Sequence, residues 1–167
     1  MLLTAIVMLF AGLSSAYIVL RGAPDWQNVT LPSMLWVSTG VLVASSVAIE
    51  FARRAIRKNH LSMMNQWLMV SGLLGFGFLA GQLLAWRQLV NAGVYLPTTL
   101  HSSFFYVLSG AHAIHLLGGI IAMGYVFARA FTGRLTVFNH EPLKLFATYW
   151  HFMLALWAYL FLLLLLA

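Results

Sequence analysis

Two histidines, His112 and His115, lie within GAHAIHLLGG (110–119), a stretch that is otherwise almost wholly apolar. If the segment is helical, their spacing places both side chains on one face, about one turn apart. Histidine can bind a metal, carry a proton, or hydrogen-bond inside a packed interface. The pair could therefore belong to a haem or metal site, to a proton relay, or to a packing contact.

A haem bound by two histidines needs them at matching depth on facing helices, and the third candidate ligand is His151. His115 lies about 12 residues, or roughly 18 Å, from the basic end of its expected helix, whereas His151 lies about 6 residues, or roughly 9 Å, from the corresponding end. His112 lies deeper still. A copper or zinc site usually needs three or four ligands. The chain has no cysteine, and its other histidines are expected in loops or near the opposite surface: His60, His101 and His140. We therefore expect no metal in this chain, and we interpret the pair as hydrogen-bonded between helices or in contact with lipid head groups or water.

The three acidic residues avoid the middle of every apolar segment. Glu50 lies three and four residues before Arg53 and Arg54, a spacing that predicts a local ion pair on a helix. Asp25 and Glu141 are expected in loops. A membrane proton pump usually carries a carboxylate within the membrane, so this chain is not expected to pump protons alone.

The elements that must position these side chains are membrane helices. Of 167 residues, 62% are hydrophobic, and only nine are basic and three acidic, whereas about a quarter of a soluble domain is charged. A spanning helix needs about 20 apolar residues, and unpaired backbone amides are not tolerated in hydrocarbon. The sequence predicts a single all-α domain over 1–167, an integral membrane bundle of five transmembrane helices at 2–20, 32–51, 67–86, 103–127 and 145–166.

The basic residues predict the orientation of this bundle. Seven of the nine lie in the second and fourth expected loops: Arg53, Arg54, Arg57, Lys58, Arg129, Arg134 and Lys144. These loops should be cytoplasmic, with the N-terminus inside and the C-terminus outside. The first segment lacks the cationic lead and cleavage site of a signal peptide, so we expect it to be a retained helix. The formal charge of +6 is explained by these loops, and no nucleic-acid partner is expected.

Small and amphipathic residues suggest how the helices pack. Glycines near the histidine pair and along the third segment allow close approach, and Gln82 could hydrogen-bond across such a seam. Four aromatic residues lie near expected span ends, as in a membrane aromatic belt: Trp67, Trp86, Tyr149 and Trp150.

Several segments, taken together and in order, resemble a known family. SSFFYVLSGAHAIHLLGGIIAM (102–123) is similar to the signature of haem-copper oxidase subunit III, and ATYWHF (147–152) resembles its YWHF segment. ASSVAIEFARRAI (44–56) and VMLFAGLSSAYIVLR (7–21) resemble two further core helices, while GQLLAW (81–86) matches more weakly. The helix count resembles the short, five-helix form of this subunit.

The resemblance implies a non-catalytic accessory subunit of a proton-translocating respiratory oxidase in the bacterial cytoplasmic membrane. Such a subunit docks on the catalytic subunit I, holds phospholipid between its helices and supports proton uptake during O2 reduction to water. It contains no haem or copper, both of which belong to the catalytic subunit. A basic residue at the position of Arg129 would meet a lipid phosphate, although Arg129 could equally be one more cytoplasmic charge. The residues expected to bind lipid or to make interhelical polar contacts are His112, His115, Arg129, Trp150, His151 and Gln82.

The sequence departs from the family pattern at four acidic positions. Ile6 stands in place of a buried glutamate, Ala85 replaces a glutamate near the end of the third helix, and Lys144 and Leu154 replace acidic residues around the YWHF segment. These four residues therefore cannot supply the carboxylates of the family pattern. The polar lead common at the N-terminus of the family is also missing, so we expect the natural start to lie upstream.

Three other interpretations remain open. A subunit III-like accessory protein of a quinol oxidase or nitric oxide reductase would share these motifs, and the electron donor does not bind this subunit in the family. A small transporter would be expected to show inverted repeats and broken helices, and neither is apparent. A haem b carrier is disfavoured by the depths of the histidines.

Overall fold

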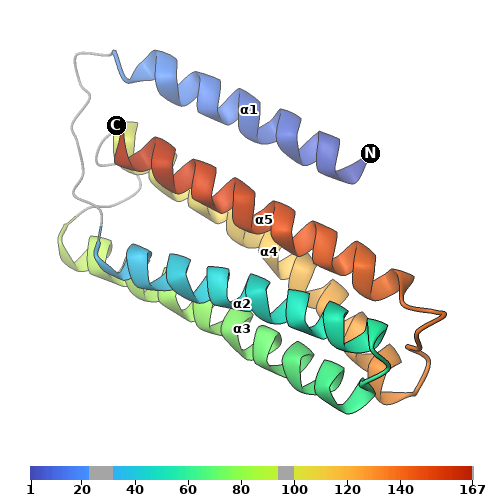
Figure 1. The fold of residues 1–167 in the computed structure, drawn as a ribbon. Coiled ribbons are helices and arrows are strands. Elements are labelled where there is room, and N and C mark those ends of the chain that lie inside the picture. Colours follow the sequence, from blue (N-terminus) through green and yellow to red (C-terminus); the bar gives the residue numbers. More distant parts are fainter. Residues whose placement is uncertain (23–31, 94–99, 167) are drawn as a thin grey trace.

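The computed structural model describes residues 1–22, 32–93 and 100–166. Over this part of the chain it contains five α-helices (Figure 1): α1 (Leu2–Leu20), α2 (Met34–Arg57), α3 (Leu61–Asn91), α4 (Leu100–Phe131) and α5 (Glu141–Leu165). Each is long and apolar enough to cross a membrane. The predicted all-helical bundle of five spans is therefore confirmed, and the expected loop at 22–28 lies largely outside the described residues.

Only α1 has the predicted ends; the other four helices are longer than the apolar segments. The largest difference is in α3, which has 31 residues and so is about 46 Å long, against a hydrocarbon thickness of about 30 Å. Hydropathy marks only the part of a helix that lies in hydrocarbon, whereas helical hydrogen bonding continues through the head-group region. The placement of Arg53, Arg54 and Arg57 in a loop was therefore wrong, because they lie in the last turns of α2. The same holds for Arg129, in the last turn of α4, and for Lys144, in the first turn of α5.

The connection between α2 and α3 is short, and the two helices pack closely along their length (Figure 1). Asn59 has a φ of 58° there, a left-handed conformation that asparagine tolerates better than most residues. A longer connection with Gly133 at φ +67° leads from α4 to α5. Among the described residues α1 contacts only α4 and α5, and the N- and C-termini lie at opposite ends of the bundle.

Trp150 is fully buried and, with Trp157, is one of the two tryptophans in the core of the described residues. Its position depends on two glycines on different helices. A Cβ atom on Gly75 of α3 would lie 3.0 Å from the indole ring, and one on Gly119 of α4 would lie 3.2 Å from it. Because side chains are absent at both positions, the ring of α5 can occupy the space between α3 and α4.

A second close approach joins α2 and α3. A Cβ atom on Gly81 would lie only 2.8 Å from Ser38 Cβ, which is close to the backbone and cannot rotate away. Small residues of this kind allow helix backbones to approach in a membrane, where packing and hydrogen bonds replace the hydrophobic effect.

We predict that Gly81→Ala will destabilise the protein by about 1–3 kcal/mol, the usual range for overpacking a core. Gly40→Ala is the matched control, since nothing lies within 4 Å of its Cβ position and alanine has the higher helix propensity. Thermal unfolding in detergent measures the difference. Equal melting temperatures for the two variants would contradict the close contact with Ser38.

Candidate functional site

A buried serine cluster, formed by Ser45, Ser71 and Trp150, joins α2, α3 and α5. The Ser45 hydroxyl donates to the Ser71 carbonyl at 2.9 Å, and the Ser71 hydroxyl donates to the Ser45 carbonyl at 3.0 Å. The indole Nε1 of Trp150 donates to Ser45 Oγ at 3.1 Å. The two serines thus form a reciprocal pair, and the helix contact leaves none of these polar side-chain groups without a partner.

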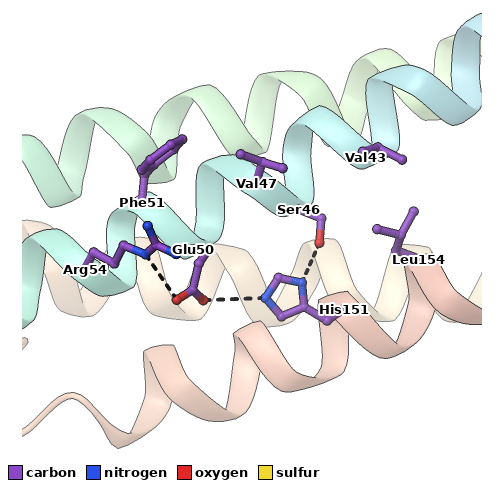
Figure 2. A pocket seen from close by; sticks show the side chains of 8 residues that line it. All are labelled: Val43, Ser46, Val47, Glu50, Phe51, Arg54, His151 and Leu154. Carbon is purple, nitrogen blue, oxygen red and sulfur yellow. Dashed lines mark hydrogen bonds and ion pairs between the residues drawn. The ribbon is translucent and has the colours of Figure 1, made fainter.

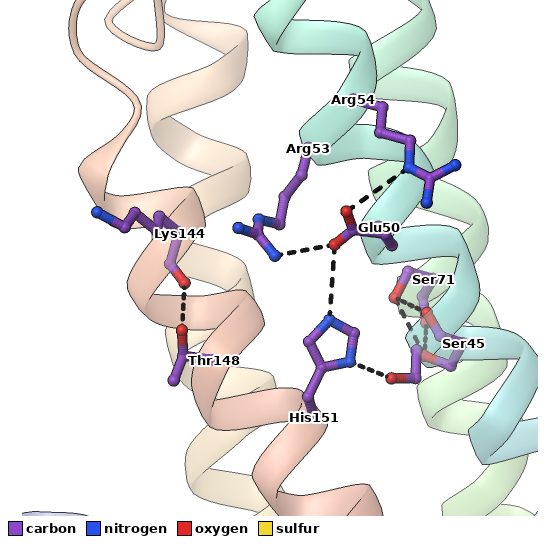
Figure 3. A network of polar contacts seen from close by, with 9 residues as sticks. Ser45, Glu50, Arg53, Arg54, Ser71, Lys144, Thr148 and His151 are labelled. Atoms are coloured by element: carbon purple, nitrogen blue, oxygen red, sulfur yellow. Dashed lines mark hydrogen bonds and ion pairs between the residues drawn. The ribbon is translucent and has the colours of Figure 1, made fainter.

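A second group, the Glu50 cluster, consists of Glu50, Arg53, Arg54 and His151 (Figure 3), together with Ser46. Arg53 Nη1 lies 2.8 Å from Glu50 Oε2, and Arg54 Nε lies 3.6 Å from Oε1. On α5, His151 Nε2 lies 3.9 Å from Glu50 Oε2, while its Nδ1 hydrogen-bonds to Ser46 Oγ at 2.5 Å. The predicted ion pairs of Glu50 are confirmed, and His151 extends them from α2 to α5.

The helical geometry of α2 explains why the two clusters are separate. Adjacent residues on a helix point about 100° apart, so Ser45 faces α3 while Ser46 faces α5. Glu50 follows Ser46 by one turn and shares its face. With the carboxylate beside Nε2, His151 favours the tautomer that has its hydrogen on Nε2, so that Nδ1 accepts from the Ser46 hydroxyl.

His112 occupies an aromatic environment in the core. It is 1% exposed, and its ring centroid lies 5.1 Å from that of Trp157 and 6.2 Å from that of Phe78. Neither ring nitrogen has a hydrogen-bond partner among the described residues. Within the described ranges His112 therefore makes ring contacts with its neighbours in place of the expected hydrogen bond across helices.

His115 differs from His112 although the two share a helix. Its Nδ1 lies 2.7 Å from the carbonyl oxygen of Ala111, one turn earlier on α4, and its ring packs edge-on against Phe10 of α1. The interhelical hydrogen bond at this residue uses the backbone instead, because Tyr149 Oη donates to the His115 carbonyl at 2.8 Å. His115 thus contacts α1 through its ring and α5 through its carbonyl.

Gln82 makes the kind of contact that was expected of it. Its Nε2 donates to Ser38 Oγ at 3.2 Å across the α2–α3 seam. The Ser38 hydroxyl in turn donates to the Leu35 carbonyl at 3.0 Å. A similar bond joins α5 to α2, from Trp157 Nε1 to Thr39 Oγ1 at 2.9 Å.

Arg129 lies in the last turn of α4, beside a groove between α1, α4 and α5. Its Nη1 donates to Tyr125 Oη at 2.9 Å, and its guanidinium lies 5.5 Å from the centroid of that ring. Tyr125 lines the groove, which has a volume of about 520 Å³. The other lining residues are mostly apolar: Leu2, Leu3, Ala122, Val126, Pro142, Leu145, Phe146, Thr148 and Tyr149.

The predicted aromatic belt is wrong for Trp150, which is fully buried in the serine cluster. Trp67, Trp86 and Tyr149 are half-buried, and Tyr149 is hydrogen-bonded to α4. Position along the sequence suggested an interface location for Trp150, but its face of α5 packs against Gly75 of α3 and Gly119 of α4, which buries the ring inside the bundle.

The described residues offer little for metal or nucleophilic chemistry. They contain no group of three or more His, Asp or Glu side chains that could hold a metal ion. Ile6 and Ala85, at two positions where the resemblance implied an acidic residue, are buried in the apolar core. The polar side chains between the helices are used for helix contacts.

Sequence reasoning did not find the contact between Ser46 and His151 or the reciprocal serine pair. The residues of these contacts are separated by 105 and 26 positions, so no local spacing could reveal them. The available signal was the occurrence of two adjacent serines, Ser45 and Ser46, in an apolar helix, which predicts two polar contacts on different faces.

The family model and the individual relatives that match this chain indicate the same family. Residues 22–166 match the family model for cytochrome c oxidase subunit III. The chain is 30% identical over 164 residues to a probable cytochrome c oxidase subunit 3 from Nocardia farcinica, covering 95% of this chain and 81% of the relative. It is also 30% identical over 163 residues to cytochrome c oxidase subunit 3 from Thermostichus vulcanus, covering 94% and 79%. The corresponding protein from Synechocystis is 31% identical over 161 residues, covering 93% and 68%.

We predict that Ser45→Ala will lower the unfolding free energy by about 1–2 kcal/mol, because it removes two helix-joining bonds and leaves the Trp150 indole without an acceptor. Thr148→Ala is the control, since Thr148 is exposed and its hydroxyl donates within its own helix, to the Lys144 carbonyl. Thermal unfolding in detergent compares the two. A loss at Thr148 as large as that at Ser45 would contradict a special role for the serine cluster.

Proposed function

This chain belongs to the cytochrome c oxidase subunit III family, and from this membership we propose that it is a non-catalytic subunit of a respiratory haem-copper oxidase. In that role it stabilises the catalytic subunit, holds phospholipid and supports proton uptake during O2 reduction to water. The observation that carries the proposal is the family match, which spans nearly the whole chain from residue 22 to 166.

The geometry supports a structural role for the polar residues. Ser45, Gln82 and His151 each bond to a neighbouring helix, and such contacts fix helix packing in a membrane. Haem and copper would reside in the catalytic subunit I of the complex. The names of the relatives favour a cytochrome c oxidase over a quinol oxidase or nitric oxide reductase.

We place the chain in the bacterial cytoplasmic membrane, by inference from its bacterial relatives. Seven of its nine basic residues lie toward the ends where α2 meets α3 and α4 meets α5. The positive-inside rule makes this face cytoplasmic, so the N-terminus would be inside and the C-terminus outside.

The groove beside Arg129 suits an acyl chain of a phospholipid. Its walls are mostly apolar, and guanidinium binds phosphate through two parallel hydrogen bonds. Arg129 is held near the groove by Tyr125, which also lines it. A phosphate at Arg129 would place the lipid tail against α1, α4 and α5.

The proposal predicts that the chain co-purifies in mild detergent with a haem-copper catalytic subunit. The complex should consume oxygen, and its haem should remain with the catalytic subunit when this chain is dissociated. Mass spectrometry of the components and a visible spectrum of each fraction are the measurements. A haem Soret band that stays with the isolated chain at near one haem per chain would overturn the assignment.

The orientation predicts that a reporter fused after Ala167 will be active only outside the cytoplasm. Paired fusions of alkaline phosphatase, which is active outside, and of a fluorescent protein that folds inside make the measurement. A fusion in the α4–α5 connection, after Gly133, should give the opposite pattern. The same pattern at both sites would contradict the topology.

Arg129→Lys keeps the charge but loses the planar fork, so we predict reduced retention of phospholipid through purification. Initial oxygen consumption should be nearly normal, and activity should decay faster with turnover because the proton supply of the catalytic subunit is less well protected. Arg134→Lys is the control, since Arg134 is exposed in the next connection. Bound lipid is measured by mass spectrometry beside activity against turnover number. If Arg129→Lys and the control match wild type in bound lipid and in the decay of activity, Arg129 only sets the topology.

A further inference from the structure

A second groove lies between α2 and α5, away from Arg129, with a volume of about 340 Å³ (Figure 2). Eight residues line it: Val43, Ser46, Val47, Glu50, Phe51, Arg54, His151 and Leu154. Six of them lie on one face of α2, at positions 43, 46, 47, 50, 51 and 54. Val43, Val47 and Phe51 are 40–48% exposed, so the groove opens on the outer surface of the bundle, where lipid would contact it.

The groove has a polar end and an apolar end. Arg54 and Glu50 lie toward the basic end of α2, while Val43, Val47 and Leu154 line the part that runs into the membrane. From Arg54 to Val43 the helix advances by about 16 Å, which is close to half of the roughly 30 Å hydrocarbon thickness. The groove therefore spans the depth of about one leaflet.

At the polar end, Arg54 and Glu50 each have atoms that could contact a further charged group. The Arg54 side chain is 65% exposed and reaches Glu50 only through Nε, at 3.6 Å from Oε1. Its terminal nitrogens have no ion pair among the described residues, and its guanidinium lies 5.9 Å from the Phe51 ring centroid at the edge of the groove. Glu50 Oε2 is occupied by Arg53 at 2.8 Å, whereas Oε1 has only the 3.6 Å contact with Arg54 within the part of the chain that the structure describes.

We propose that this groove binds a zwitterionic phospholipid with a primary ammonium. Its phosphate would be bound by the free edge of Arg54, its ammonium by Glu50 Oε1, and one acyl chain by the apolar end of the groove. A guanidinium fork matches a phosphate, and an ammonium has three N–H donors for a carboxylate oxygen. The inference extends lipid binding to another pair of helices and does not depend on Arg129.

The charge pattern selects this head group over its relatives. A purely anionic head group would supply a phosphate for Arg54 but no ammonium donor for Glu50 Oε1, the carboxylate oxygen that has only the long contact with Arg54. A choline head group carries the same phosphate, but its quaternary ammonium has no N–H to donate. Phosphatidylethanolamine supplies both the phosphate and an ammonium N–H donor. The preference for this lipid over the other two therefore tests the role of Glu50, and the total amount of bound lipid tests the role of Arg54.

The test uses the assembled complex in nanodiscs that contain equal amounts of phosphatidylethanolamine, phosphatidylcholine and phosphatidylglycerol. In separate samples, one of the three lipids carries a diazirine in its acyl chain. After illumination, mass spectrometry quantifies labelling of residues 43–51 and of Leu154. We expect phosphatidylethanolamine to label this groove about threefold more than either other lipid, the scale of one partly exposed ion pair.

Two variants separate the contributions. Glu50→Gln should make labelling of the groove nearly equal for the three lipids, and Arg54→Gln should lower labelling by all three. Glu141→Gln and Arg134→Gln are matched controls on exposed residues outside the groove, and they should keep the wild-type pattern. Oxygen consumption and subunit composition verify that each variant has assembled.

Wild type alone decides the outcome if Glu50→Gln does not assemble. Equal labelling by phosphatidylethanolamine and phosphatidylcholine would overturn the proposal, as would stronger labelling by phosphatidylglycerol. Absence of label in the groove, with lipid label at Arg129 retained, would overturn this site and leave the proposed function of the subunit intact. Absence of α2–α5 label because another subunit covers the groove would likewise overturn it.

Discussion

The packing of four helices depends on the burial of one indole ring. Trp150 of α5 lies between Gly75 and Gly119, whose Cβ atoms would meet the ring at 3.0 and 3.2 Å, and it donates to Ser45. In hydrocarbon the ring must both fit the space between the helices and have a partner for its N–H group. No water is present there to fill a gap or to accept that hydrogen bond. The ring therefore fixes the spacing of α3 and α4 and, through its N–H group, the rotation of α2.

The same constraint explains how α2 divides its polar side chains. Ser45 faces inward and completes a closed set of hydrogen bonds with Ser71 and Trp150. Ser46 and Glu50 face α5 and the open groove, where Glu50 keeps an incompletely used oxygen. Satisfied groups thus join helices, while the partly satisfied carboxylate lies where a further molecule can reach it.

The sequence predicts the helix count well, because hydropathy over about 20 residues reports directly on membrane burial. It also predicts the Glu50 ion pairs, which follow from spacing within one helix. It misplaces Trp150, and it does not find the bond between Ser46 and His151, because these depend on which helix faces meet. His112 shows the same limit: its residue type suggested a hydrogen bond, whereas its neighbours are aromatic rings.

The contacts of α1 have a consequence for assembly. This helix precedes the other four in the chain, yet among the described residues it touches only α4 and α5. During synthesis α1 would enter the membrane before its docking surface exists, while α2 and α3 could pair as soon as both are inserted. Contacts between segments distant in sequence form late, so α1, which is made before α2 to α5, should reach its place after them. The early membrane intermediate would then be an α2–α3 hairpin beside an undocked α1.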